Sequence, residues 1–510
     1  MSDAAPLVIL GFDGGDPDLL LRWAQEGHLP TLAAVLQRGW WANTGGPDLV
    51  TEHGPWLHMF SGISRGRLGY YYFRQLKPGT YDLHLATGRG LNAPPFWATL
   101  QGGDRKVAIF DVPEVRSVAG LRGVQLTNWS VHQGWVSDDP ADAPRAEPPE
   151  LLDEVRRIFG TRLDIPENSD SDFDEDRRIY HRLLEQVSRS GMLYRAYVGR
   201  HRFDVIVIVF AASHTGGHQF WKYHHESGPK HELTHAVRDI YAAIDREMGL
   251  LLAHGLADAN VVVVSSVGMQ DHYPMGGLTE AFCRRLGYQV SPPFAPSLMG
   301  YARRVVPERW RVAVSRHFSR ARRERLLADQ FRCGTEWSRT TAFAIPSSYS
   351  GFLRVNLRGR EPQGIVEPGA EYEAVLCRLE NDLRQLTDPD TGEPAVQRVA
   401  RTRALFGDDA NPGLPDLFVI WKPLARFRSR LVHPAGELVQ SRPEWCRGSD
   451  HSQQGFVAAA GPGMRARGRV ADVALMDLAP TFLALLNAPV PQAMRGTVRR
   501  ELVRQASGTV

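Results

Sequence analysis

Four short apolar runs, each rich in β-branched residues and bordered by helix-like sequence, constrain what this chain can fold into. They occupy residues 7–11, 107–110, 205–210 and 261–265. Continuous apolar runs of this length are typical of strands buried on both faces of a parallel sheet. Because strands that alternate with helices form βαβ units, the sequence predicts an α/β fold with a doubly wound, mostly parallel sheet. Two further runs, 418–421 and 456–460, likewise resemble buried parallel strands.

The carboxyl ends of these runs are where we expect a ligand site. In open α/β sheets, ligands bind in the crevice beyond the carboxyl ends of the strands. Asp13 follows the first run, residues 213–218 follow the third, and residues 265–269 end the fourth. These three places are therefore the candidates for a functional site.

The chain is long enough for one large core, since 43% of its 510 residues are hydrophobic. We expect a single α/β domain over residues 1–510, interrupted by two insertions. Residues 136–176 are rich in Pro, Asp and Glu and indicate an exposed excursion or partial cap. Residues 290–335 indicate either a solvated helical insertion or a basic lid that attracts an anionic substrate. The arginines of this second insertion include Arg303, Arg304, Arg309, Arg311, Arg316, Arg320, Arg322, Arg323 and Arg325.

Composition argues against several kinds of partner and compartment. The 60 basic and 57 acidic residues give a net charge of +3, which offers no general case for nucleic-acid binding. The four cysteines lie far apart without a CxxC pair, so a disulfide framework is not expected and a reducing cytoplasm fits. We find neither a signal-peptide pattern nor an apolar stretch of about 18 residues that would span a membrane. Nothing in the sequence sets the oligomeric state.

Two histidines spaced four apart in HTGGH, residues 214–218, are the first chemical signal. On a helix, His214 and His218 lie on one face, and imidazole is the commonest metal ligand in proteins. Gly216 and Gly217 are poor helix formers, so a strand-to-helix loop fits the segment equally well. The spacing alone is a weak signal, because two histidines bonded to backbone groups give the same pattern.

Two further segments contain polar residues beside apolar runs. Asp13, in GFDGGDP, is placed to approach a metal or a phosphate, or to cap a turn or a helix. His451, in GSDHSQQGF, precedes an apolar run and has no clear role when taken by itself.

The order of nine segments along the chain is more informative than any one of them. They are VILGFDGGDPDLL (8–20), PWLHMFSGISRGRLG (55–69), FDVIVIVFAASHTGGHQFWKY (203–223), VVVVSSVGM (261–269), GFLRVNLRGREPQGIV (351–366), DPDTGEP (388–394), LPDLFVIW (414–421), GSDHSQQGF (448–456) and LMDLAPTFLALLNAPVP (475–491). In this order the chain resembles the type I phosphodiesterase/nucleotide pyrophosphatase branch of the alkaline phosphatase superfamily. The resemblance spans most of the chain and implies a doubly wound sheet with the active site at its C-terminal edge.

The resemblance implies a site for two metal ions about 4 Å apart, with a Thr or Ser nucleophile between them. One metal of such a site is held by an Asp, a His four residues on, and a distant His. These positions match His214, His218 and His451 in this chain. Because His214 stands where the family has Asp, three imidazoles would hold this metal.

The second metal of the family's site is implied to use Asp13, the nucleophile and an Asp-His pair that follows a strand. That pair matches Ser266 and Val267 here. A valine side chain cannot ligate a metal and a serine is a poor replacement for a carboxylate, so we expect the second site to be empty or very weak. Asp271 and His272, just past the altered pair, could substitute if the loop takes another route.

The nucleophile position is also altered. Counted back from Trp56 and Gly62, it falls on Glu52, and a one-residue slip would place it on Thr51. Glu52 could act as a fourth metal ligand beside the three histidines, or as a general base on a metal-bound water.

These departures leave three functions open. The first is a hydrolase or transferase that acts on a phosphate, sulfate or related ester through one divalent metal ion, for which zinc is suited. The second is a mononuclear redox or lyase-type enzyme, since imidazole also binds Fe, Mn, Cu and Ni. The third is a non-catalytic binding protein with a degenerate site, against which the retained histidines count. The expected partner is a small anionic substrate, with no nucleic acid and no membrane.

Other conspicuous residues are interpreted as structural. Arg358, Arg360 and Glu361, in NLRGREPQG, are expected to form turn and ion-pair contacts near a sheet edge. His58 is expected to pack in the interior.

Overall fold

The computed structural model describes residues 5–131, 143–165, 171–224, 230–293, 318, 320–443 and 446–504. It divides into two compact units. The first unit comprises residues 1–68, 87–270 and 449–510, and the second comprises residues 69–86 and 271–448. This division differs from the single domain that the sequence predicts, because residues 271–448 form a sheet and a core of their own. The described part of the basic insertion is thus a small portion of a larger folded unit.

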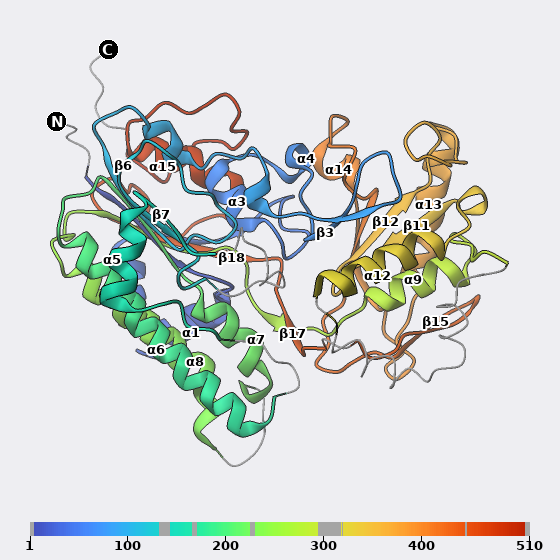
Figure 1. Ribbon diagram of the computed structural model, residues 1–510, viewed down its shortest axis with the longest axis horizontal. Coiled ribbons are helices and arrows are strands. Elements are labelled where there is room, and N and C mark those ends of the chain that lie inside the picture. The colour runs from blue at the N-terminus through green and yellow to red at the C-terminus, as the bar shows by residue number, and fades with distance from the viewer. Residues whose placement is uncertain are drawn as a thin grey trace. The chain divides into compact units, whose positions relative to one another are not determined.

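A ten-stranded sheet built from described residues forms the centre of the first unit (Figure 1). Its strand order is β19-β2-β18-β9-β1-β8-β5-β6-β7, with β20 beside β2. The run β9-β1-β8-β5-β6 is parallel throughout, which confirms the predicted fold class. The strands are β1 (Leu7–Phe12), β2 (Trp40–Gly45), β5 (Lys106–Phe110), β6 (Arg122–Thr127), β7 (Arg145–Glu147), β8 (Val205–Phe210), β9 (Asn260–Ser265), β18 (Gly455–Ala460), β19 (Gly468–Arg469) and β20 (Val473–Ala474).

Strand β1 shows why the apolar runs are continuous. Val8, Leu10 and Phe12 belong to the core on one face of the sheet, whereas Leu7 and Ile9 belong to the core on the other. Successive side chains of a strand point to opposite faces, so a strand covered on both sides must be apolar at every position. Helices cover both faces accordingly.

The helices of the first unit separate into two layers. One face packs against α1, α2, α5, α6, α7 and α8, and the other packs against α3 and α15. Their bounds are α1 (Pro17–Gln25), α2 (Pro30–Arg38), α3 (Pro55–Ser61), α4 (Arg65–Leu68), α5 (Glu150–Phe159), α6 (Phe173–Val198), α7 (Ala212–His224), α8 (Ala236–Leu252) and α15 (Leu478–Leu485), with 3-10 turns at Gly88–Gly90, Phe96–Leu100, Glu232–His235 and Leu475–Asp477. Within the described residues, no helix has the length and apolar character needed to cross a bilayer.

The two C-terminal apolar runs take directions that the sequence does not specify. Strand β18 pairs antiparallel with both β9 and β2. The run at 418–421 lies in the second unit, in strand β14 (Leu417–Trp421), which pairs antiparallel with both its neighbours. The prediction that these two runs are parallel strands is therefore wrong. A buried strand is apolar whatever the direction of its neighbours, so its composition does not reveal that direction.

The acidic, Pro-rich segment 136–176 is part of the first unit where it is described. Strand β7 extends the main sheet as an antiparallel edge strand beside β6. Helix α5 buries Leu151 and Val155 in the core of the same face as α6. These residues are therefore integral to the fold rather than an excursion, while residues 136–142 and 166–170 lie outside the described part of the chain.

The second unit is organised around a four-stranded antiparallel sheet with the order β11-β12-β14-β13. Residues at alternate positions, such as Leu353 and Val355, share a core with Phe282 of α9 and Leu379 of α13. Its strands are β3 (Arg74–Leu76), β4 (Leu83–Leu85), β11 (Ala342–Ile345), β12 (Gly351–Val355), β13 (Val396–Arg401), β15 (Arg430–His433) and β16 (Gly436–Val439), its helices α9 (Gly276–Arg285), α12 (Arg320–Cys333), α13 (Ala370–Arg384) and α14 (Thr402–Phe406), and a 3-10 turn spans Trp337–Arg339. Two short strands, β10 (Gln270–Asp271) and β17 (Ser449–Asp450), lie at the positions along the chain where one unit ends and the other begins.

Helix α12 makes up most of the described part of the basic insertion. Glu324 of this helix forms a two-pronged ion pair with Arg74 of β3, at 2.7 Å for each contact. Phe331 is buried against Trp337. The helix is thus anchored to the second unit by an ion pair and an apolar contact. The arginines Arg303, Arg304, Arg309, Arg311 and Arg316 lie outside the described residues, so the lid stays a prediction.

Candidate metal centre

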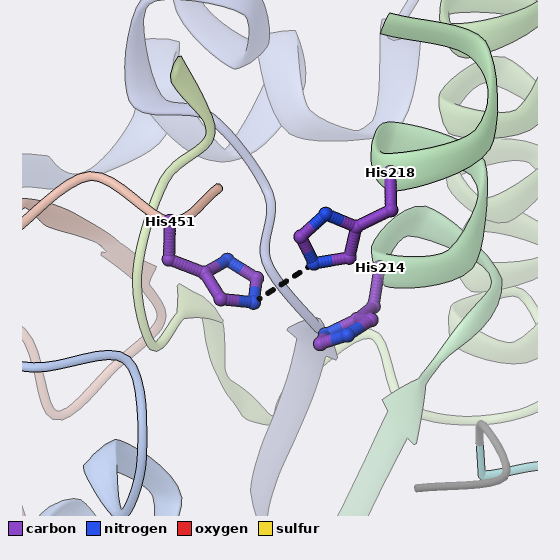
Figure 2. A group of neighbouring side chains, drawn as sticks. All are labelled: His214, His218 and His451. Carbon is purple, nitrogen blue, oxygen red and sulfur yellow. Dashed lines mark hydrogen bonds between the residues drawn. The ribbon is translucent and has the colours of Figure 1, made fainter. Parts of the chain in front are cut away.

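Three histidines converge at the carboxyl ends of the parallel strands, where the fold predicts a ligand site. His214 and His218 come from α7, which follows β8, and His451 comes from the connection between β17 and β18. One ring nitrogen from each lies within 4.8 Å of the others. The ring centroids are 4.7, 4.7 and 4.8 Å apart, close to an equilateral triangle. Figure 2 shows the three rings directed toward one another.

The HTGGH segment is helical, which settles the choice between a helix and a loop. A Cβ on Gly216 would lie 2.6 Å from Ile240 Cδ1 on α8, and a Cβ on Gly217 would lie 3.1 Å from Met269 Cγ. The two glycines therefore allow α7 to approach its neighbours closely. Their low helix propensity, about 1 kcal/mol each relative to alanine, is offset by this packing.

The outer nitrogens of two rings are held in a way that fixes their tautomers. His451 Nδ1 lies 3.1 Å from the carbonyl oxygen of Gly268, to which it must donate. Ser449 Oγ donates to the His218 carbonyl at 3.3 Å, so it accepts from His218 Nδ1 at 3.4 Å. Each Nδ1 thus carries the proton in the neutral ring, and each Nε2 presents a lone pair. Partners of this kind orient the histidine ligands of metal sites.

The inner nitrogens fit a divalent cation. His218 Nε2 and His451 Nε2 are 3.3 Å apart (dashed line in Figure 2). Two lone pairs that face one another at this distance repel unless a proton or a metal ion lies between them. Nitrogens bound to one zinc ion at the usual distance and tetrahedral angle lie about 3.3 Å apart. The donor set and its spacing therefore match an imidazole-bound divalent metal.

Asp13 lies beside this group without belonging to it. The indole Nε1 of Trp56 donates to Asp13 Oδ1 at 2.7 Å, and Asp13 Oδ2 is 3.5 Å from His214 Nδ1. The backbone carbonyl of Asp13 accepts from Ser213 Oγ at 2.8 Å, which ties the end of β1 to the start of α7. Gly14 (φ +62°) has room for no side chain, because a Cβ there would lie 2.9 Å from His451 Cε1.

In the loop after β9, Ser266 and Val267 stand at the two ligand positions of the family and both are buried. The serine before them, Ser265, is bonded to backbone groups. Ser265 Oγ lies 2.6 Å from the carbonyl oxygen of Gly15 and 2.7 Å from that of Val267. Val267 is buried in the apolar core on the α3 face of the sheet. Within the described residues, His214, His218 and His451 are the one group of three or more His, Cys, Asp or Glu side chains that converge in this way. The expectation of an empty second site stays a prediction.

Asp16 joins the loops that follow β1 and β9. Its Oδ1 caps α1 by accepting from the Leu19 amide at 3.0 Å, and its Oδ2 accepts from the Met269 amide at 3.3 Å. Burial raises the pKa of this carboxyl above its usual range, although both amides favour the charged form. Asp16 thus positions the loop that carries Gly268, the partner of His451.

The loop that carries Thr51 and Glu52 rests on a buried arginine. Arg65 is fully buried and donates to the carbonyl oxygens of Asp48 at 2.8 Å and His53 at 2.6 Å. Burial raises the pKa of Asp48 to about 6. Thr51 is buried and Glu52 is half-buried. The Glu52 carboxylate is not part of the ligand group, so its role as a fourth ligand stays a prediction.

Two other histidines are packing residues. His58 is fully buried on α3, its Nδ1 donates to the Ile63 carbonyl at 2.9 Å, and burial lowers its pKa to about 3. His272 belongs to the second unit, where it packs on Tyr349 with ring centroids 5.8 Å apart and burial lowers its pKa to about 4. Neither His272 nor Asp271 is in the ligand group found among the described residues.

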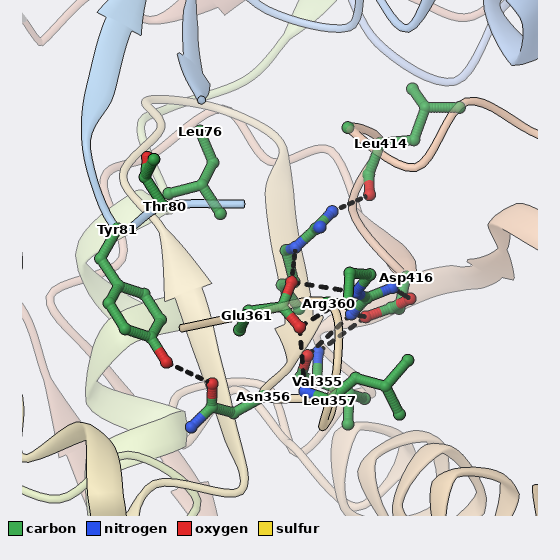
Figure 3. Close-up of polar contacts among 12 residues, drawn as sticks. Leu76, Thr80, Tyr81, Val355, Asn356, Leu357, Arg360, Glu361, Leu414 and Asp416 are labelled. Atoms are coloured by element: carbon green, nitrogen blue, oxygen red, sulfur yellow. Dashed lines mark hydrogen bonds and ion pairs between the residues drawn. The ribbon is translucent and has the colours of Figure 1, made fainter. Parts of the chain in front are cut away.

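The NLRGREPQG segment forms an ion-pair network in the second unit, shown in Figure 3. Arg360 makes two contacts of 2.7 Å with Asp416, and Arg354 contacts Glu361 at 2.6 Å. Asp416 keeps a pKa below its usual range despite its burial, because Arg360 lies beside it. Arg358 forms an exposed pair with Glu367. These contacts confirm that the segment is structural.

Sequence reasoning missed the groups that orient the ligands. Trp56, Ser449 and Gly268 hold Asp13, His218 and His451 respectively. Trp56 is the partner whose position in the sequence, close to the altered nucleophile, could have suggested a role. Ser449 and the Gly268 carbonyl carry no signal that would separate them from other serines and peptide groups.

Comparisons with known proteins agree with the family that the sequence resembles. The profile of the type I phosphodiesterase/nucleotide pyrophosphatase family matches residues 7–434. Phosphonoacetate hydrolase from Sinorhizobium meliloti 1021, solved in complex with phosphonoformate, is similar in fold with a TM-score of 0.50 and 13% identity, covering 95% of this chain and 96% of that one. Murine ectonucleotide pyrophosphatase/phosphodiesterase 5 is more distant, with a TM-score of 0.45 and 12% identity over 98% of this chain and 100% of that one.

A comparison with curated protein sequences finds no match. The family profile covers well over half of the chain. The chain belongs to the type I phosphodiesterase/nucleotide pyrophosphatase family.

Proposed function

We propose that this protein is a hydrolase or transferase that acts on a phosphate, sulfate or related ester of a small anionic molecule through a single divalent metal ion. The observation that carries the proposal is the pair of Nε2 lone pairs of His218 and His451, which face one another at 3.3 Å. Membership of a family of phosphodiester and pyrophosphate hydrolases supports the reaction class. We further propose that the protein acts in the cytoplasm.

The three histidines would hold the ion through their ring nitrogens. Zinc fits best, since three imidazoles are a common ligand set of catalytic zinc. When bound, the ion supplies Lewis-acid catalysis and lowers the pKa of a coordinated water. Because neutral His214 stands where the family has an Asp, the ligand set carries one negative charge fewer. This strengthens the attraction for an anionic ester.

Glu52 is the residue to which we assign the proton transfer. Its carboxylate would take the proton of the attacking water while the water oxygen bonds to phosphorus and the ester oxygen departs. Partial exposure of Glu52 and full burial of Thr51 favour Glu52 as the residue that meets substrate. Arg65 supports this loop by donating to the carbonyls of Asp48 and His53, which restricts the movement of the loop.

A second candidate function is a mononuclear redox or lyase-type reaction. One feature favours it: the ligand group contains three imidazoles and no carboxylate among the described residues. Such a set binds Fe, Mn and Cu as well as Zn. The two candidates therefore differ first in the metal that the native protein contains.

The test is turnover of an aryl phosphodiester by the zinc-loaded protein. We expect hydrolysis that a chelator abolishes and that zinc restores. We expect Glu52→Gln to lower turnover by about a hundredfold or more while zinc content is retained, because a general base is lost. Thr51→Val, the neighbouring control, should leave most of the activity.

The opposite ranking of the two variants would reassign the catalytic residue. If Thr51→Val abolishes turnover and Glu52→Gln does not, Thr51 is the nucleophile and the assignment of Glu52 is wrong. If the native protein contains iron, consumes oxygen and does not turn over esters, the redox candidate replaces the hydrolase.

A further inference from the structure

A buried carboxylate on α6 holds the helix that carries two of the candidate ligands. Asp176 lies in the first turn of α6 and is fully buried. Its Oδ1 accepts from Gln219 Nε2 at 2.5 Å, and its Oδ2 accepts from the Tyr223 hydroxyl at 2.6 Å. The ammonium group of Lys222 lies 2.6 Å from the same Oδ2. All three partners belong to α7, so one carboxylate holds the second half of that helix.

The three partners lie on a face of α7 next to the face of the ligands. Gln219, Lys222 and Tyr223 are spaced three and four residues apart, so they share one side of the helix. Gln219 directly follows His218, and consecutive side chains leave an α-helix about 100° apart around its axis. A contact that fixes the direction of Gln219 therefore also fixes the direction of His218.

The start of the same helix is held as well. Ser213, directly before His214, donates through Oγ to the backbone carbonyl of Asp13 at 2.8 Å. The two histidines of α7 thus lie between two anchored residues, Ser213 and Gln219. We propose that Asp176 is a positioning residue of the metal centre, which fixes the rotation of α7 and thereby the direction of its two imidazoles. The inference rests on the proposed three-histidine metal site.

The contact between the helices is directional, which apolar packing alone is not. Ser171 Oγ donates to Asp176 Oδ1 at 2.5 Å and accepts from Gln219 Nε2 at 2.7 Å, so two oxygens hold the Gln219 amide. The apolar contact of Tyr180 with Phe220, at 6.0 Å between ring centroids, joins the same helices without a preferred direction. A buried carboxylate adds little net stability even when it is paired, whereas its hydrogen bonds restrict the geometry.

Substitution of Asp176 by Asn tests the role, because an amide has one acceptor oxygen where the carboxylate has two. That oxygen can serve Gln219 or the pair of Tyr223 and Lys222, but not both. We expect one zinc per chain and a roughly tenfold weaker zinc dissociation constant, the lower end of what loss of a group behind the ligands causes. Competition with a chromophoric chelator measures both quantities.

The visible absorption of the cobalt(II)-substituted protein is a second measurement, because it depends on the arrangement of the ligands around the metal. We expect its bands to shift in Asp176→Asn. Tyr223→Phe removes one donor and keeps the ring, so it should change affinity and spectrum in the same direction by a smaller amount. If Asp176→Asn does not fold, Tyr223→Phe carries the test.

Asp245→Asn is the matched control. Asp245 is a fully buried carboxylate of α8 and accepts from the amides of Thr31 at 2.9 Å and Leu32 at 2.8 Å. It thus holds α2 rather than the ligand helix. Its substitution should lower thermal stability and leave both zinc affinity and the cobalt spectrum unchanged, which separates positioning from general destabilisation.

The outcomes separate the inference from the proposed function. If Asp176→Asn and Tyr223→Phe bind one zinc per chain with unchanged affinity and spectrum, Asp176 is purely structural, and the three-histidine site stands without it. If Asp245→Asn changes affinity and spectrum as much as Asp176→Asn does, the effect is general destabilisation and the inference is overturned. If the unaltered protein binds no metal, the site and the inference are both wrong.

Discussion

The loops that follow β8 and β9 occupy equivalent places on either side of β1, yet they have opposite properties. After β8, helix α7 presents His214 and His218 to a common point. After β9, the positions that match the family's ligand pair are Ser266 and Val267, and the valine is buried in the core. The hydroxyl of the preceding Ser265 contacts two backbone carbonyls. Both loops end parallel strands at the edge where the fold places its sites.

Under the proposed single-metal site, the difference corresponds to a two-metal architecture reduced to one without loss of the fold. Each polar group of a former ligand position must find a partner or be replaced by an apolar group, since an unsatisfied buried polar group costs about 1–3 kcal/mol. On the β9 side, replacement by Val267 meets that condition. On the β8 side, His214 stands where the family has an Asp ligand, and its Nδ1 lies 3.5 Å from Asp13 Oδ2.

The largest expected effect contrasts one residue from each loop. His218→Ala removes an inner nitrogen and should weaken zinc binding by more than about a hundredfold, beyond what loss of an orienting group causes. Ser266→Ala, on the β9 side, should leave zinc affinity within a fewfold of the unaltered protein. Chelator competition measures both, and a comparable loss in Ser266→Ala would mean that the β9 loop still contributes to the site.

A second prediction concerns the packing that keeps the ligand helix in place. Gly216→Ala introduces a methyl group 2.6 Å from Ile240 Cδ1, so the buried Ile240 side chain must move. We expect a loss of about 1–2 kcal/mol in unfolding free energy, despite alanine's higher helix propensity, together with weaker zinc binding. Gly45→Ala, where nothing lies within 4 Å, is the control. Stabilisation by Gly216→Ala in denaturant titrations would show that the close approach is not required.

The smallest expected effect lies on the β9 side. Ser265→Ala removes a hydroxyl that contacts the carbonyls of Gly15 and Val267. We expect about 1 kcal/mol of destabilisation, the usual worth of a buried hydrogen bond, with no change in zinc stoichiometry. Thermal unfolding and metal analysis of the same preparation give both numbers. A change in stoichiometry would contradict a purely structural role for this loop.

Much of the first unit could be predicted because its buried strands are continuous apolar runs in the sequence. The runs at 7–11, 107–110, 205–210 and 261–265 correspond to β1, β5, β8 and β9, with each end within one residue. The run at 418–421 could not be assigned, because an apolar strand of an antiparallel sheet in a separate unit has the same composition. The division into two units depends on long-range contacts that local patterns do not encode.

The residue types of the candidate ligands could be predicted from their positions in the family pattern. His214, His218 and His451 do come together in the structure. The sequence could not decide whether the HTGGH segment is a helix or a loop. The glycines favour a loop locally, whereas packing against Ile240 and Met269 favours a helix. The relation of Asp13 to His214 was not predictable either, since it depends on the direction of the Trp56 indole.

Metal analysis of the protein purified without added metal tests the central claim most directly. The account predicts close to one divalent metal ion per chain, lost in His218→Ala and retained in Ser266→Ala. Two ions per chain would mean that the β9 side still forms a site, and no metal in a folded, active protein would mean that the three histidines serve another purpose.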